Sequence, residues 1–181
     1  MILLTTSLRP TRRVRSFCND IQRVLPNVIR VTRGKLALDA LAEKALELNA
    51  NGVVVVERWK GEPSKITFYR VTSKGLETFF PILFLANVKL QRDYGQIYKP
   101  VGKIAVSCSS ALSEDARRVA ESFSEFFRLP ILESNANFRK IDATLNFSSQ
   151  FGCVVKVSLT HPPVVREVGP SFTVKTVKWN P

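Results

Sequence analysis

The chain has 181 residues, of which 45% are hydrophobic, enough for one large core or two small ones. This composition excludes a disordered chain, and the longest apolar run, at 79–86, is far shorter than the about 20 residues of a membrane-spanning helix. The net charge of +12 and the pI of about 10.1 predict a polyanionic partner, first a nucleic acid and second an anionic membrane surface.

The first 35 residues carry the strongest charge imbalance of the chain. They hold eight of the 27 Lys and Arg residues against a single Asp, and so contribute +7 of the net +12. The apolar and β-branched run at 2–6 predicts a buried strand, and Thr11 is suited to cap a helix over 12–25 that Pro26 ends. With a second strand at 28–31, we predict a strand-helix-strand unit that has a basic outer surface.

The helix predicted over 12–25 is amphipathic at about 100° per residue. Its apolar stripe consists of Val14, Phe17, Cys18, Ile21 and Leu25. The opposite face is formed by Arg12, Ser16, Asn19 and Arg23, with Arg13 and Arg15 on the flanks. One side of the helix therefore enters a core, and the other displays a row of guanidinium groups.

The turn after the second strand sets Gly34 between Arg33 and Lys35. Glycine permits close backbone approach, so amides and side chains together could contact a phosphate there. An ordinary turn with two solvated charges explains the same residues, and for this segment alone we favour that interpretation.

The next segment predicts a helix over 36–49 with an acidic outer face, ended by Gly52 as a left-handed cap. Strands at 53–57 and 65–71 flank a turn rich in Gly and Pro, so a β-hairpin is expected. A further strand at 76–85 contains Pro81, which indicates an edge strand or a bulge rather than a central strand.

The polar segment 87–102 is interpreted as the connection between two halves. It mixes aromatic and cationic groups at Arg92, Tyr94, Tyr98 and Lys99. These side chains could stack on unpaired bases, at about 1–3 kcal/mol per base. A connection packed by its tyrosines is the alternative.

After the connection the opening pattern returns. A strand at 103–107, a helix over 114–127 and a strand at 131–132 repeat the first unit in order and spacing, which indicates an internal duplication. The second helix has a mixed-charge outer face, so the first half is expected to be the better polyanion binder. Residues 134–152 suggest only a loop followed by a short helix or strand.

The remaining segments predict β structure. Alternation at 153–159 is typical of a strand, and 164–179 predicts a hairpin pair around Gly169-Pro170. The chain has three widely spaced cysteines and a single histidine, which argues strongly against a zinc site or a Cys/His nucleophile pair. We therefore expect neither a metal nor a cofactor.

Several short pieces, in this order, carry a family resemblance. They are Thr5-Thr6-Ser7 before the Arg-rich helix, Pro26-Asn27 with Arg30, Arg33 and Gly34, Gly61-Glu62-Pro63, Ala86-Asn87-Val88 with Leu90, Arg92 and Asp93, and Glu167 to Phe172. Together they resemble the Brix domain family of ribosome-assembly proteins over essentially the whole chain. The family commonly has arginine after Gly-Pro, whereas this chain has Ser171.

The resemblance implies a single Brix domain over 1–181 with an α/β fold. Its two halves, about 1–90 and 100–181, would be duplicated units with mixed sheets, each resembling the anticodon-binding domain of class IIa aminoacyl-tRNA synthetases. It also implies an archaeal ribosome biogenesis factor that binds ribosomal RNA or its precursor and assists rRNA processing with other ribosome-assembly proteins. Such a protein would be cytoplasmic, or nucleolar in a eukaryote, without a membrane partner.

The residues expected to contact RNA are Arg9, Arg12, Arg13, Arg15, Arg23, Arg30, Arg33, Lys35 and Arg92. A basic adaptor that binds an acidic protein within a ribonucleoprotein is the alternative hypothesis. An enzyme acting on nucleic acid is the third, but such enzymes need clustered carboxylates for metal or a Gly-rich phosphate loop. The acids of this chain are scattered and no such loop is present, so we expect no catalytic residues.

Overall fold

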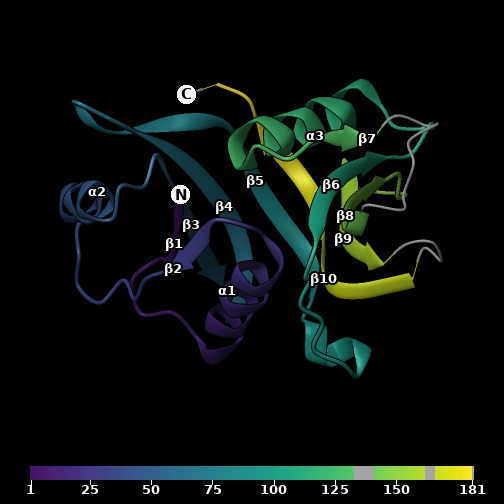
Figure 1. Ribbon diagram of the computed structural model, residues 1–181, viewed down its shortest axis with the longest axis horizontal. Helices are drawn as coiled ribbons and strands as arrows, with labels where there is room; N and C mark the ends of the chain where they lie inside the picture. Colours follow the sequence, from purple (N-terminus) through teal and green to yellow (C-terminus); the bar gives the residue numbers. More distant parts are fainter. Residues whose placement is uncertain (133–140, 162–165, 181) are drawn as a thin grey trace.

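The computed structural model of the protein describes residues 1–132, 141–161 and 166–180 (Figure 1). The first half comprises β1 (Ile2–Thr6), α1 (Arg12–Val24), β2 (Val28–Arg30), α2 (Leu38–Glu47), β3 (Gly52–Trp59), β4 (Glu62–Thr72) and β5 (Gly75–Lys89). The short 3-10 helix η1 (Gln91–Tyr94) follows. The second half comprises β6 (Lys103–Cys108), α3 (Glu114–Phe127), β7 (Ile131–Leu132), β8 (Ile141–Ser148), β9 (Val155–His161) and β10 (Arg166–Lys178).

The described strands form one mixed sheet of ten strands in the order β2-β1-β3-β4-β5-β10-β9-β8-β6-β7. In each half, the first strand lies parallel to its two neighbours, and an antiparallel meander follows. The antiparallel pair of β5 and β10 joins the halves. The mixed α/β class predicted from the sequence is therefore confirmed.

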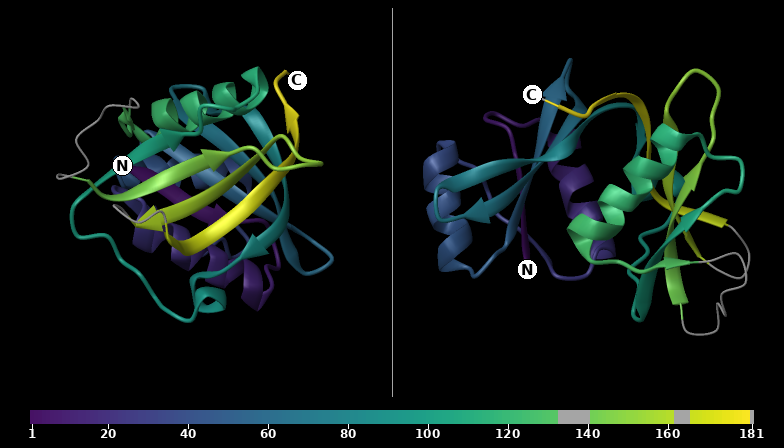
Figure 2. Two further views of the ribbon diagram at one scale, coloured as in Figure 1. Left: turned by 90° about the vertical axis from the view of Figure 1, so that its right-hand side faces the viewer. Right: turned by 90° about the horizontal axis from the view of Figure 1, so that it is seen from above.

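Helices α1 and α3 lie between the two arms of the curved sheet, whereas α2 covers the outer face of the first arm (Figure 2). Phe17 of α1 packs edge-to-face on Phe172 of β10, with ring centroids 5.9 Å apart. Phe123 and Phe126 of α3 pack on Phe68 of β4, at 5.5 and 5.0 Å. Each of these helices thus contacts strands of the other half, and the halves share one core. None of the helices within the described ranges has the length and apolar character to span a membrane.

Most of the predicted elements are confirmed within a few residues, and α3 begins and ends at the predicted residues. Thr11 and Ser113 cap α1 and α3, as their hydroxyl oxygens accept from the amides of Val14 and Ala116. The predicted cap at Gly52 is wrong, because the left-handed residue after α2 is Asn49, with φ of +52°. Gly52 instead begins β3, and a Cβ there would lie 2.9 Å from Cζ of Phe126.

Two strand predictions also need correction. Pro81 does lie at an irregularity of the ladder, but β5 is a central strand, paired with β4 and β10. The hairpin around Gly169-Pro170 is wrong, because β10 runs through both residues with a register shift between Glu167 and Ser171 against β9. Gly169, at a φ of +69°, absorbs this irregularity within one strand.

The segment that the sequence left unassigned contains β8, so the strand alternative is confirmed for Ile141–Ser148. Its first part, and residues 162–165 before β10, lie outside the described residues. The strand predicted at 153–159 is shifted to Val155–His161.

Candidate nucleic-acid interface

The start of α1 presents three exposed cations of the predicted set. Arg9, in the preceding loop, and Arg12 and Arg15, in the helix, are exposed. Arg15 donates to the carbonyl of Pro10 at 3.0 Å, and none of the three forms an ion pair with the described acids. Their guanidinium groups are therefore available to an anionic ligand.

Arg13 has a different environment, although it is a neighbour in sequence. Its Nε donates to the carboxylate of Glu62 at 2.5 Å, and one terminal nitrogen donates to the carbonyl of Val88 at 2.9 Å. The carboxylate of Asp93 lies 3.6 Å from the same nitrogen. Arg13 thereby connects α1 to the β3–β4 hairpin and to the end of β5, and its side chain is 31% exposed.

Arg23 and Arg92 come together at the far end of α1, although they are distant in sequence. Both line a hollow of about 120 Å³ between α1 and η1, together with Ser16 and Asn19. Arg23 also pairs with Asp20 at 3.0 Å, while the amide of Gln91 donates to the other oxygen of Asp20 at 2.9 Å. Burial raises the pKa of Asp20, against the opposite influence of these partners.

The remaining predicted cations lie away from the exposed face of the first turn. Arg30 is half-buried and donates to Asn19 at 3.0 Å. Arg33 is 8% exposed and donates to the carbonyl of Leu36 at 2.6 Å, so it stabilises the turn toward α2 and has little surface to offer a ligand. Gly34 has a φ of +56°, and Lys35 is exposed. The favoured interpretation, an ordinary turn with two solvated charges, is therefore correct for Lys35 and wrong for Arg33, which is buried.

The sequence interpretation missed the tip of the β3–β4 hairpin, which it treated only as a turn. Arg58, Trp59 and Lys60 are all exposed there, and Trp59 is exposed over 71% of its surface. Thr11 donates its hydroxyl to the carbonyl of Gly61 at 2.6 Å, so this tip lies beside the start of α1. The signal for this surface in the sequence is the aromatic Trp59 between two cations, Arg58 and Lys60.

The connection between the halves is packed by its tyrosines. Tyr94 donates to Glu167 at 2.9 Å and lies 2.5 Å from the hydroxyl of Ser171. Tyr98 donates to the backbone carbonyl of Asp142 at 3.0 Å. Burial raises the pKa of both tyrosines to about 12. The geometry thus supports a packed connection rather than a base-stacking surface at these two residues.

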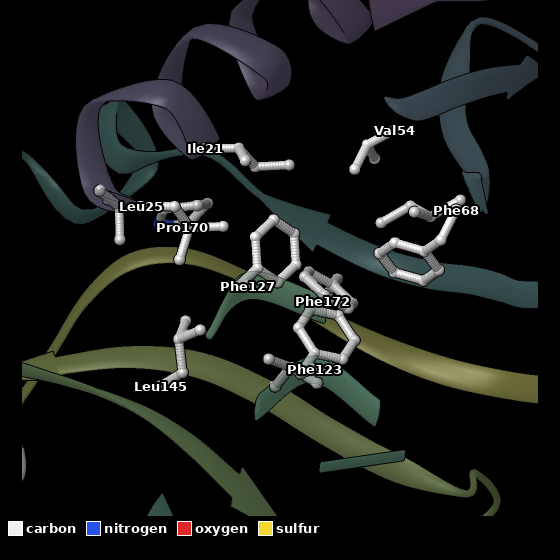
Figure 3. Close-up of a pocket in the computed structure, with 12 residues that line it drawn as sticks. Ile21, Leu25, Val54, Phe68, Phe123, Phe127, Leu145, Pro170 and Phe172 are labelled. Atoms are coloured by element: carbon white, nitrogen blue, oxygen red, sulfur yellow. The ribbon is translucent and has the colours of Figure 1, made fainter. Parts of the chain in front are cut away.

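An apolar cavity of about 40 Å³ lies between α1 and α3 (Figure 3). Its walls include Ile21 of α1 and Leu25 just after it, Phe123 and Phe127 from α3, and Phe172 from β10. It has room for about one water molecule, and its lining offers no charged side chain, so we interpret it as a packing gap in the shared core.

Potential metal ligands and thiols do not gather into a second site. Among residues 1–132, 141–161 and 166–180, no group of three or more His, Cys, Asp and Glu side chains is positioned to hold a metal ion. Cys18 lies on the buried face of α1, and burial raises the pKa of its thiol to about 12. This thiol is therefore a small apolar side chain, as predicted.

No family model matches the sequence as a whole or in part. Relatives named probable Brix domain-containing ribosomal biogenesis protein match at 42% identity over 95 residues in Pyrococcus horikoshii and at 36% over 129 residues in Pyrococcus abyssi. These alignments cover 52% and 69% of this chain but only 42% and 57% of the relatives, about half their length. A relative of the same name in Methanococcus maripaludis is 26% identical, and its alignment covers 98% of this chain and 97% of that protein.

In sequence, the chain is similar to Brix domain-containing ribosomal biogenesis proteins. Solved structures share its fold. A crystal structure of a probable ribosomal biogenesis protein from Aeropyrum pernix has a TM-score of 0.79 at 23% identity and covers 99% of this chain and 96% of its own. An archaeal Imp4-like protein has a TM-score of 0.68 at 21% identity, covering 98% and 99%. At these identities the likeness concerns the fold.

The Brix motif pieces have structural roles in this chain. Glu62 of Gly61-Glu62-Pro63 holds Arg13 of α1. A Cβ on Gly169 would lie 2.6 Å from the ring of Tyr94, so the Gly-Pro piece of β10 permits η1 to pack closely. Ser171 is 2% exposed and contacts the Tyr94 hydroxyl, so the position where the family commonly has arginine is internal here.

Proposed function

We propose that this protein is a non-catalytic ribosome biogenesis factor that binds ribosomal RNA or its precursor through the basic face at the start of α1. The observation that carries the proposal is the set of three exposed arginines, Arg9, Arg12 and Arg15, that form no ion pair with the described acids. The relatives in Pyrococcus and Methanococcus are named as ribosomal biogenesis proteins, which supports the ribosomal context.

Phosphate contacts by these arginines would supply affinity without reading sequence, because the RNA backbone is uniform. RNA shape and unpaired bases would supply the specificity. The non-catalytic role rests on the sequence, in which the acids are scattered and a Gly-rich phosphate loop is missing.

We further propose that the Brix domain spans 1–181 as two duplicated halves, about 1–90 and 100–181, each similar to an anticodon-binding domain. The mirrored strand order about the β5–β10 pair supports this origin. A role in ribosome assembly would give the protein other assembly factors as partners and the archaeal cytoplasm as its location.

The test is RNA binding across a salt series, for wild type and a triple variant Arg9→Ala, Arg12→Ala and Arg15→Ala. Ribosomal RNA fragments are the ligands, and duplex DNA of matched length is the comparison. The triple variant should bind RNA more weakly, and its log–log salt slope should fall by about 0.7–0.9 for each phosphate that the variant no longer neutralises.

The matched control removes the same charge from the second half, through Lys103→Ala, Arg117→Ala and Lys175→Ala, all at exposed positions. This control should keep the salt slope of the wild type within error. An equal decrease in both triple variants would mean that net charge, rather than the α1 face, drives binding. Wild-type binding that is weak and equal for all nucleic acids would favour the adaptor that binds an acidic protein.

A further inference from the structure

Trp59 ends β3 at the tip of the β3–β4 hairpin and is exposed over 71% of its surface. The tip is a two-residue turn in which Lys60 and Gly61 have φ of +49° and +89°. Left-handed conformation at both positions is typical of the tight hairpin turn whose twist matches its strands. The indole is therefore presented from a defined backbone rather than from a long loop.

A hollow of about 480 Å³ lies beside the indole, within the range of about 300–1,000 Å³ that is common for small-ligand sites. Pro63 and Ser64 of β4 line it, as do Leu85 and Asn87 of β5. Its wall combines apolar surface with polar side chains, as a site for a flat, polar-edged group requires.

The hollow and the tip are joined to the basic face of α1 by two contacts. The Thr11 hydroxyl donates to the carbonyl of Gly61 at 2.6 Å, and Arg13 Nε donates to Glu62 at 2.5 Å. Through the second contact, the Arg13 guanidinium also balances the negative charge of the Glu62 carboxylate, which lines the hollow. Arg58 and Lys60 flank Trp59 in the sequence, and Arg9 and Arg12 lie at the start of α1. These four exposed side chains form no ion pair with the acids that the structure describes, so the tip and the start of α1 both carry unpaired positive charge.

We propose that Trp59 is a stacking platform for an unpaired nucleobase, and that the hollow beside it receives that base while the α1 arginines hold the adjoining phosphates. This inference rests on the proposed function and makes it more specific, since the ligand becomes single-stranded or bulged RNA. In an A-form duplex the base faces are stacked on each other, so a duplex has no free face for the indole. The surrounding cations complement a polyphosphate chain, and this favours RNA over a protein partner.

The first test compares Trp59→Ala, Trp59→Phe and wild type for binding to a short single-stranded RNA, to the same strand with abasic sugars, and to the same strand annealed to its complement. Trp59→Ala should weaken binding to the base-containing strand about 5- to 150-fold, the range for one base–aromatic stack. Trp59→Phe should restore most of this affinity. The abasic strand and the duplex should bind all three proteins equally.

The second test uses fluorescence, because the chain has two tryptophans. Trp179 lies under the guanidinium of Arg118, whose Cζ is 4.1 Å from the ring centroid, so Trp179→Phe leaves Trp59 as the reporter. The single-stranded RNA should quench this fluorescence, and the abasic strand should not. Unchanged far-UV circular dichroism would show that the substitutions at Trp59 and Trp179 leave the fold intact.

The outcomes separate the two proposals. Salt-sensitive RNA binding with neither quenching nor an effect of Trp59→Ala would overturn the stacking site, assign the tip to a protein contact and leave the proposed function standing. No binding of any RNA by the wild-type chain at low salt would overturn both.

Discussion

Glu167 is the centre of a polar cluster that attaches β10 to the connection between the halves. It accepts from the Tyr94 hydroxyl at 2.9 Å and pairs with the ammonium group of Lys156. Burial acts to raise its pKa, but these hydrogen bonds outweigh burial and hold the pKa of Glu167 below its ordinary value of 4.5. The folded protein therefore favours the ionised carboxylate more than the unfolded chain does.

This difference predicts an acid-dependent decrease in stability. The contribution of Glu167 is present above pH 4.5 and is lost as the pH falls through the lower folded-state pKa, because protonation then favours the unfolded chain. We expect Glu167→Gln to lower the free energy of unfolding at neutral pH and to flatten its decline in acid, as measured by urea unfolding over a pH series. Glu43→Gln, at an exposed position, is the control that should follow the wild type. A parallel decline of Glu167→Gln and wild type would contradict this role.

At the scale of elements, the position of α1 depends on Arg13. The side chain of Arg13 contacts three other elements, through Glu62 in β4, Val88 in β5 and Asp93 in η1. Three elements are thereby connected to the first turn of the helix. The Arg13 guanidinium, a candidate phosphate contact in the sequence, is in this structure hydrogen-bonded to Glu62 and to the Val88 carbonyl.

We expect Arg13→Ala to lower the free energy of unfolding by about 1–3 kcal/mol, because it removes charge-assisted hydrogen bonds to Glu62 and to the Val88 carbonyl. Arg12→Ala, one residue away but exposed, should change it by no more than about 0.5 kcal/mol. Urea unfolding monitored by circular dichroism measures both. Equal stability of the two variants would mean that Arg13 does not hold α1 in place.

At the scale of the whole molecule, the two halves share a single core. Phe68 of β4 contacts Phe123, Phe126 and Phe127 of α3, with ring centroids between 5.0 and 6.2 Å apart. The first half therefore completes the packing of the second, and neither half buries its apolar face alone.

We expect Phe68→Ala to cost about 3–5 kcal/mol, the usual range for removing a buried aromatic side chain. Because the core is shared, hydrogen exchange should accelerate equally in β3 of the first half and in β9 of the second. Phe151→Ala, at a fully exposed position, is the control and should leave both rates unchanged. Faster exchange confined to the first half would show that the halves unfold independently.

The amino-acid sequence alone specifies the local elements of this protein, since strand alternation, helical period and caps act over a few residues. Helix α3, for example, follows from the cap at Ser113 and the apolar stripe that ends at Phe127. The charge of the first unit is likewise a property of the sequence alone. The short motif pieces carried the resemblance to the Brix family.

How distant segments combine depends on the tertiary structure. It makes β5 a central strand despite Pro81, and it carries β10 through Gly169-Pro170. It also pairs Arg13 with Glu62, 49 positions away, whereas the neighbouring Arg12 stays accessible. The contact of Thr11 with Gly61 brings the hairpin tip that carries Trp59 to the start of α1. The physical reason is that pairing and exposure depend on contacts between residues far apart in the chain, and no local pattern contains them.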